Sequence, residues 1–134
     1  PHPLVLWDYT DMSDPRWTWG QRFILLRDSA KIPSHQKVGM VVPEGWVAYV
    51  AHNNLFVKKF AFILGARYPD GCSGILFTNA AQSQLESKSQ VMCLNPKSVI
   101  EYVEDWYLFD NVPLPQNDAD VDQYVIPKIK TILS

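Results

Sequence analysis

The sequence lacks the features that mark several large classes of protein. It has 12 Lys and Arg residues against 14 Asp and Glu, and a net charge of −2 argues against the clustered basic surface that nucleic acids require. No apolar run approaches the ~20 residues that a membrane-spanning helix needs. The first residues, PHPLVLWDYTD, contain neither a basic segment nor a long apolar one, so they do not form a signal peptide. We therefore expect neither a nucleic-acid partner nor a membrane partner.

Cysteine is scarce as well. Cys72 and Cys93 are the only two cysteines. Two cysteines do not make a zinc site, which needs four grouped ligands, and we expect neither a metal nor a cofactor. Because cysteine prefers protein interiors, we predict two buried free thiols rather than a disulfide. Free thiols favour a reducing compartment, and hence a cytoplasmic location.

The chain also lacks an initiating methionine. Pro1 is therefore expected to follow a processing or cloning cut, which leaves open that the chain is a fragment. Its 134 residues suggest one domain, long enough to bury about two-thirds of its unfolded surface. A hydrophobic content of 47% and a charged content of 19% are typical of a globular protein.

Short apolar or alternating runs separated by turns predict about eight strands and hence an all-β antiparallel sandwich. The longest run ends at Asp110, and we expect its Ser98–Phe109 part to be a central strand, with a sandwich domain over residues 1–110. The predicted strands are Phe23–Arg27, Lys37–Val42, Trp46–Ala51, Leu55–Leu64, Ser73–Phe77, Gln84–Ser87, Gln90–Leu94 and Ser98–Asp110.

Residues 111–134 differ from the rest of the chain. A Pro- and Asp-rich loop is followed by apolar residues at helical spacing from Val121 to Ile132, which predicts a C-terminal helix. Asn117 or Asp118 could cap this helix. Pro127 must kink or split the helix unless it lies in the first turn of a second segment.

Glu104 is the first candidate for chemistry. On an extended strand its neighbours on the same face are Tyr102 and Trp106, so the carboxylate would be partly desolvated. It could accept hydrogen bonds from a sugar or act as a general acid or base. Equally, it could be a structural carboxylate paired with Arg, Lys or a Trp N–H group.

Other candidate side chains come from the strands and their turns. Lys58 and Lys59 are adjacent in a strand, so they point to opposite faces. One could bind a ligand, or both could be solvated at a sheet edge. The histidines have no metal-ligand spacing, and His52 in a hairpin turn is the best functional candidate among them. Trp46 and Trp106 could stack against the apolar face of a sugar, although tryptophan is common in protein cores.

Six segments from Asp14 to Phe109, in this order and spacing, resemble the C-terminal part of the galactose mutarotase (aldose 1-epimerase) superfamily, and in particular an uncharacterised bacterial branch of it. They are DPRWTWG, KVGMVVPEGWVAYV, NNLFVKKF, YPDGCSGILFTN, QLES and the proline turn leading into EYVEDWYLF. The resemblance implies part of a mutarotase-like β-sandwich and a small-molecule sugar as ligand. The candidate ligand-binding residues are then Lys58, Trp46, Trp106 and Glu104.

The resemblance does not extend to catalysis. The glutamate base of the epimerases would match Ile75 or a neighbour, and the segment SGILFTN has no acid. Glu104, Glu86 and His52 are the remaining catalytic candidates. We therefore expect a carbohydrate-binding domain without epimerase activity. The alternatives are a structural or assembly domain that binds protein, and a sugar epimerase that uses Glu104 or Glu86. A homo-oligomer, or a missing N-terminal half of the same protein, is the further partner considered.

Overall fold

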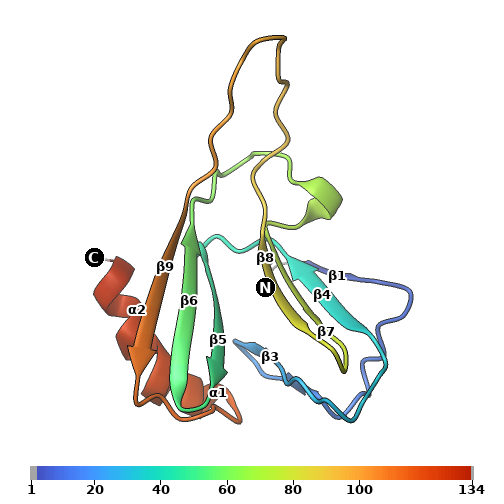
Figure 1. Cartoon of the computed structure of the whole chain (residues 1–134), viewed down its shortest axis with the longest axis vertical. Helices are drawn as coiled ribbons and strands as arrows, with labels where there is room; N and C mark the ends of the chain where they lie inside the picture. The colour runs from blue at the N-terminus through green and yellow to red at the C-terminus, as the bar shows by residue number, and fades with distance from the viewer. Residues whose placement is uncertain (1–2, 134) are drawn as a thin grey trace.

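Residues 3–133, the part of the chain that the computed structural model describes, form three antiparallel sheets and a C-terminal helical segment (Figure 1). The sheets have the strand orders β1-β4-β7-β8, β2-β3 and β5-β6-β9. The strands of these residues are β1 (Leu4–Leu6), β2 (Trp17–Trp19), β3 (Ile24–Leu26), β4 (Gln36–Met40), β5 (Trp46–Ala51), β6 (Asn54–Phe60), β7 (Gly74–Thr78), β8 (Ser83–Ser87) and β9 (Glu104–Asp110). The helical elements are η1 (Pro69–Gly71), α1 (Asp118–Asp120), η2 (Val121–Val125) and α2 (Ile126–Leu133).

The predicted fold class is confirmed. All strand pairings are antiparallel, and the two larger sheets stand side by side as the layers of a sandwich-like fold (Figure 1). The helical segment covers one face of β5-β6-β9. There Val121, Val125 and Ile129 pack against Leu55 and Val57 of β6, and all five side chains are buried. Burial of this apolar stripe is the main reason why so short a helix is stable.

The predicted helix cap and proline position are both confirmed. The side chain of Asn117 accepts a hydrogen bond from the backbone N–H of Asp120 at 3.0 Å, which satisfies one otherwise unpaired donor. The helix then passes through the π-helical turn η2 directly before α2. Pro127 is therefore the second residue of α2, where its missing N–H does not break the hydrogen bonding of that segment.

The hairpin between β5 and β6 is also as predicted, although β6 ends at Phe60 and not at Leu64. Its two turn residues, His52 and Asn53, have φ angles of 50° and 61°. Two positive φ values are typical of the tight turn that matches the twist of antiparallel strands.

The prediction of a central strand over Ser98–Phe109 is wrong. Strand β9 begins only at Glu104 and pairs with β6 alone, so it is an edge strand. Its odd-numbered residues Tyr107 and Phe109 pack against the core beneath the helix. The even-numbered face that was expected to be internal carries Trp106 and Leu108, which are 67% and 77% exposed. Alternation identified the two faces correctly, but the helix covers the odd-numbered one.

Residues 88–103 form a long excursion between β8 and β9, which we call the arm; it extends away from the sheets at the top of Figure 1. The strand predicted for Gln90–Leu94 falls in the arm and is absent from the described structure. The tip is a turn in which the backbone N–H of Ser98 donates to the carbonyl of Asn95 at 3.0 Å, and Lys97 has a φ of 67°. The arm therefore contains Gln90–Leu94 and the first residues of Ser98–Asp110, both of which were predicted to be strands.

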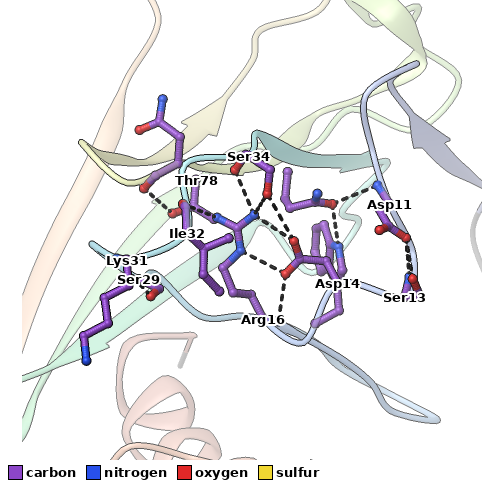
Figure 2. A network of polar contacts seen from close by, with 12 residues as sticks. Asp11, Ser13, Asp14, Arg16, Ser29, Lys31, Ile32, Ser34 and Thr78 are labelled. Atoms are coloured by element: carbon purple, nitrogen blue, oxygen red, sulfur yellow. Dashed lines mark hydrogen bonds and ion pairs between the residues drawn. The ribbon is translucent and has the colours of Figure 1, made fainter.

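A buried polar network holds the N-terminal segment to the loop before β4 (Figure 2). The Arg16 guanidinium donates two hydrogen bonds of 2.9 Å to the Asp14 carboxylate. It also donates to the carbonyl of Ser34 at 2.8 Å. Nearby, Gln36 Oε1 accepts from the indole of Trp17 at 2.9 Å. Each buried side-chain polar atom among the described residues has a hydrogen-bond partner, so this network carries no unpaired buried group that would destabilise the fold.

Both cysteines are free, as predicted, but only one is buried. Cys72, which lies two residues before β7, is buried against Gly39 of β4, and burial raises the pKa of its thiol. Cys93 lies in the arm and is exposed, because its segment is not the buried strand that was expected. The described helices include none that is long and apolar enough to cross a membrane.

Candidate functional site

A groove lies where the edge strand β8 approaches the face of β5-β6-β9 that points away from the helical segment. Its volume is about 360 Å³. Seven residues from three strands of one sheet, from β8 and from the loop after β3 line it: Asp28, Tyr49, Phe56, Lys58, Ser83, Leu85 and Trp106. This volume is within the range of ~300–1,000 Å³ that is usual for small-molecule sites.

Strand register brings the aromatic and basic side chains of the groove together. Tyr49 of β5 is opposite Phe56 of β6, and Lys58 of β6 is opposite Trp106 of β9. Directly opposed residues share a face, and positions two apart on one strand do as well. Strand pairing therefore brings together Tyr49, Phe56, Lys58 and Trp106, which span positions 49 to 106 of the chain.

Lys58 lines the groove and pairs with Glu104, which lies next to it. The Lys58 ammonium is 3.4 Å from Glu104 Oε1 and donates to the carbonyl of Leu85 at 2.9 Å. Glu104 also accepts hydrogen bonds from the hydroxyl of Ser87 and the indole N–H of Trp106, the latter at 3.0 Å. Partial burial acts to raise the pKa of Glu104, but these donors and the ammonium outweigh it and hold the pKa below its ordinary value.

The Trp106 ring stands at the mouth of the groove. At 67% exposure it is the most exposed of the five tryptophans, all of which lie within the described residues. The ring of Phe56 contacts it edge-on, with centroids 5.6 Å apart and an interplanar angle of 83°. The Lys58 ammonium is 5.8 Å from the centroid of the Trp106 ring. These contacts and the hydrogen bond from its N–H to Glu104 hold the indole in place, and its 67% exposure leaves much of its surface accessible to a ligand.

Tyr49 and Asp28 supply a second polar pair in the groove. The Tyr49 hydroxyl donates to Asp28 Oδ2 at 2.8 Å. Burial first, and then the neighbouring carboxylate, raise the pKa of Tyr49 above its ordinary value. The hydroxyl therefore stays protonated at neutral pH, and Asp28 retains free acceptor positions toward the groove.

The structure brings together three of the predicted ligand-binding residues, Lys58, Glu104 and Trp106. Trp46 does not join them. It is opposite Lys59 in the β5–β6 pairing and packs toward the core beneath the helix, on the other face of the sheet. The two lysines point to opposite faces as predicted, because the Lys59 ammonium donates to the carbonyl of Ile132 at 2.8 Å. Neither is a solvated edge residue, since β6 is the middle strand.

The other two catalytic candidates lie elsewhere. Glu86 is on the face of β8 opposite to Leu85, and its carboxylate is 3.6 Å from the ammonium of Lys37. His52 is exposed in the turn that joins β5 to β6. The sites proposed on Glu104, Glu86 and His52 are therefore three separate places on the molecule. No group of three His, Cys, Asp or Glu side chains in the described residues could hold a metal ion.

Sequence reasoning missed five of the seven lining residues. Tyr49 and Phe56 could have been found, because a two-residue turn at His52-Asn53 fixes the hairpin register and places both on the face of Lys58. No local signal marks Asp28, Ser83 or Leu85, which reach the groove from another sheet and a loop.

Comparisons with known proteins found no relative: no family model, no curated protein and no solved structure matches this chain.

Proposed function

We propose that the groove binds a carbohydrate, that the domain is mutarotase-like in type, and that this chain does not catalyse epimerisation. The observation that carries the proposal is the exposed Trp106 ring beside the Lys58–Glu104 pair. Sugars have apolar C–H faces that stack on aromatic rings and hydroxyl groups that need donors and acceptors close by. The groove offers an exposed aromatic ring together with hydrogen-bond donors and acceptors.

The lining chemistry favours a neutral sugar. Lys58 is paired with Glu104, so its charge is offset within the site. Asp28 adds a further acceptor to the lining of the groove. An anionic sugar would have to compete with two carboxylates for one ammonium, whereas sugar hydroxyls can donate to the carboxylates and accept from the lysine.

Two arguments support binding without catalysis. Ring opening at the anomeric centre needs one group to take a proton and another to give one. Glu104 is already engaged by Lys58, Ser87 and Trp106, and the other carboxylate of the groove, Asp28, accepts from the Tyr49 hydroxyl. Its pKa lies below the ordinary value, which makes it a weaker base and a scarce proton donor at neutral pH. Glu86 is not in the groove, so it cannot supply the partner.

The test is titration calorimetry, or NMR shift mapping, with methyl glucosides, methyl galactosides and their disaccharides. We expect weak binding that Trp106→Ala abolishes. Leu108→Ala is the matched control, because Leu108 lies on the same face of β9, is more exposed, and does not line the groove. Loss of binding in both variants, or no binding of any sugar by the parent protein, would count against the proposal.

Polarimetry on fresh α-glucose and α-galactose separates binding from catalysis. We expect no acceleration of mutarotation over buffer. Acceleration that Glu104→Gln abolishes and the surface change Glu44→Gln leaves intact would establish the epimerase alternative instead.

A further inference from the structure

The arm exposes a nearly continuous run of large apolar side chains to solvent. All thirteen residues from 91 to 103 are exposed. Seven of them are large apolar or aromatic residues with 38% to 85% exposure: Val91, Met92, Leu94, Val99, Ile100, Tyr102 and Val103. Lys97 and Glu101 are the only charged residues among these thirteen. Contiguous exposed apolar surface of this kind marks a contact site in soluble proteins.

The arm has almost no internal backbone pairing. Within the described residues its two limbs form no strand ladder, and the tip turn at Asn95–Ser98 provides its one backbone hydrogen bond between arm residues. Most of its backbone N–H and C=O groups therefore face water. Extended backbone with free donors and acceptors is able to pair with another chain.

The base of the arm, in contrast, is firmly attached. The backbone N–H of Lys88 donates to the carbonyl of Ser73 at 2.9 Å, and the Lys88 ammonium is 2.8 Å from Asp70 Oδ2. The N–H of Val91 donates to the carbonyl of Arg67 at 2.7 Å. The hydrogen bond between the side chains of Ser87 and Glu104 closes the base by joining the end of β8 to the start of β9. A fixed base directs the arm and reduces the entropy lost when it docks.

A second unfilled apolar feature lies in the body of the protein. A cleft of about 1140 Å³ is bordered by the two larger sheets, by β3 and by the C-terminal helical segment, and its walls are mostly uncharged. The half-buried Leu25, Met40 and Leu76 contribute to the walls, and Leu4 and Leu133 lie at exposed positions of the lining. The cleft is larger than the groove and shares only Asp28, Tyr49, Ser83 and Leu85 with it.

We propose that the arm of one molecule occupies the cleft of a second copy of this chain, and that the exchange is reciprocal about a two-fold axis. The arm points away from its own sheets, so it can enter only another molecule's cleft (Figure 1). Both surfaces are poor in charge, as the centres of protein interfaces are.

The extent of contact also fits a dimer. A two-fold axis uses each arm and each cleft once and leaves neither exposed. Thirteen arm residues together with a share of the cleft lining on each molecule approach the ~20–30 residues a side of a standard interface. The proposal stands apart from sugar binding, because the assembly is measured without a sugar.

The experiment combines sedimentation equilibrium with the reactivity of Cys93. We expect a monomer–dimer equilibrium, and we expect the arm's exposed thiol to become protected from maleimide as the protein concentration rises. Cys72 is buried in each state and serves as the internal reference. A protein that is monomeric at high concentration, with Cys93 fully reactive, would overturn the proposal.

Three variants separate the arm from the cleft. Ile100→Glu in the arm and Leu133→Glu at the cleft should each weaken the dimer by roughly tenfold or more, because each places a charge in an apolar contact. Leu64→Glu is the matched control: Leu64 is 90% exposed and belongs to neither surface. Circular dichroism and thermal melts verify that each variant is folded. A dimer that Ile100→Glu leaves intact would overturn the proposal, and so would one that Ile100→Glu disrupts while Leu133→Glu does not.

Discussion

Two carboxylate–cation pairs of this protein have similar chemistry and different surroundings. Asp14 and Arg16 are 2.9 Å apart, with side chains only 7% and 2% exposed. Glu104 and Lys58 are 3.4 Å apart, with side chains 22% and 13% exposed. The first pair lies within the body of the protein (Figure 2), and the second lies beside the groove.

The difference is in what surrounds each pair. Arg16 uses its remaining donors on the carbonyls of Ile32 and Ser34 and on the Ser34 hydroxyl, so its hydrogen bonding is satisfied within the protein. Lys58 and Glu104 border an open space that a ligand can enter. A perturbed carboxyl pKa occurs in both places, since hydrogen bonds from Arg16 also lower the pKa of Asp14. The pKa alone therefore does not distinguish a structural pair from a binding pair, and access to the pair does.

Breaking the enclosed pair should have the largest effect. Arg16→Met leaves the Asp14 carboxylate buried without its cation, and we expect a loss of about 3–5 kcal/mol in the free energy of unfolding. Urea denaturation measures it. The matched control is Arg22→Met, which removes an exposed pair with Asp122 and should cost less than about 1 kcal/mol. Equal effects in the two variants would show that enclosure does not set the strength of the Asp14 pair.

Breaking the groove pair should have a smaller effect on stability and a large one on binding. Lys58→Met leaves Glu104 with its Ser87 and Trp106 donors and with access to water, so we expect a loss of about 1–2 kcal/mol. Sugar binding should be lost. Denaturation and calorimetry on the same samples measure both, with the exposed Lys31→Met as control. A loss of stability as large as that of Arg16→Met would identify Lys58 as purely structural.

Acid should weaken both pairs, with the smallest effect of the three. The folded-state pKa values of Asp14 and Glu104 are both lowered from ordinary values of 3.8 and 4.5. A lowered carboxyl pKa contributes stability that is fully present above the ordinary value and is lost as the pH falls through the folded value. We therefore expect the urea midpoint to fall as the pH drops below the ordinary values of these two carboxyl groups. Asp14→Asn should reduce this pH dependence more than Glu104→Gln, and the reverse order would contradict the comparison.

Local patterns in the sequence predicted several elements well. The β5–β6 hairpin followed from two polar turn residues between apolar runs, and the helix from apolar spacing, a capping Asn117 and the position of Pro127. These features depend on contacts between near neighbours, so nearby residues encode them. The arm was missed because its sequence, QVMCLNPKSVIEYV, has the apolar content of a strand and no local mark of exposure.

For the candidate site as well, local sequence patterns determined some features and tertiary packing decided the others. By itself the sequence determined that Glu104 and Trp106 share one face of a strand, and that Lys58 and Lys59 take opposite faces, because side chains alternate along extended backbone. Only the tertiary structure decided that the C-terminal helix covers the face of Trp46 and leaves that of Trp106 open. It also brought Asp28 and Ser83 to the groove from a distant loop and another sheet. The physical reason is that alternation relates neighbours along a chain, whereas burial depends on which distant segment packs against each face.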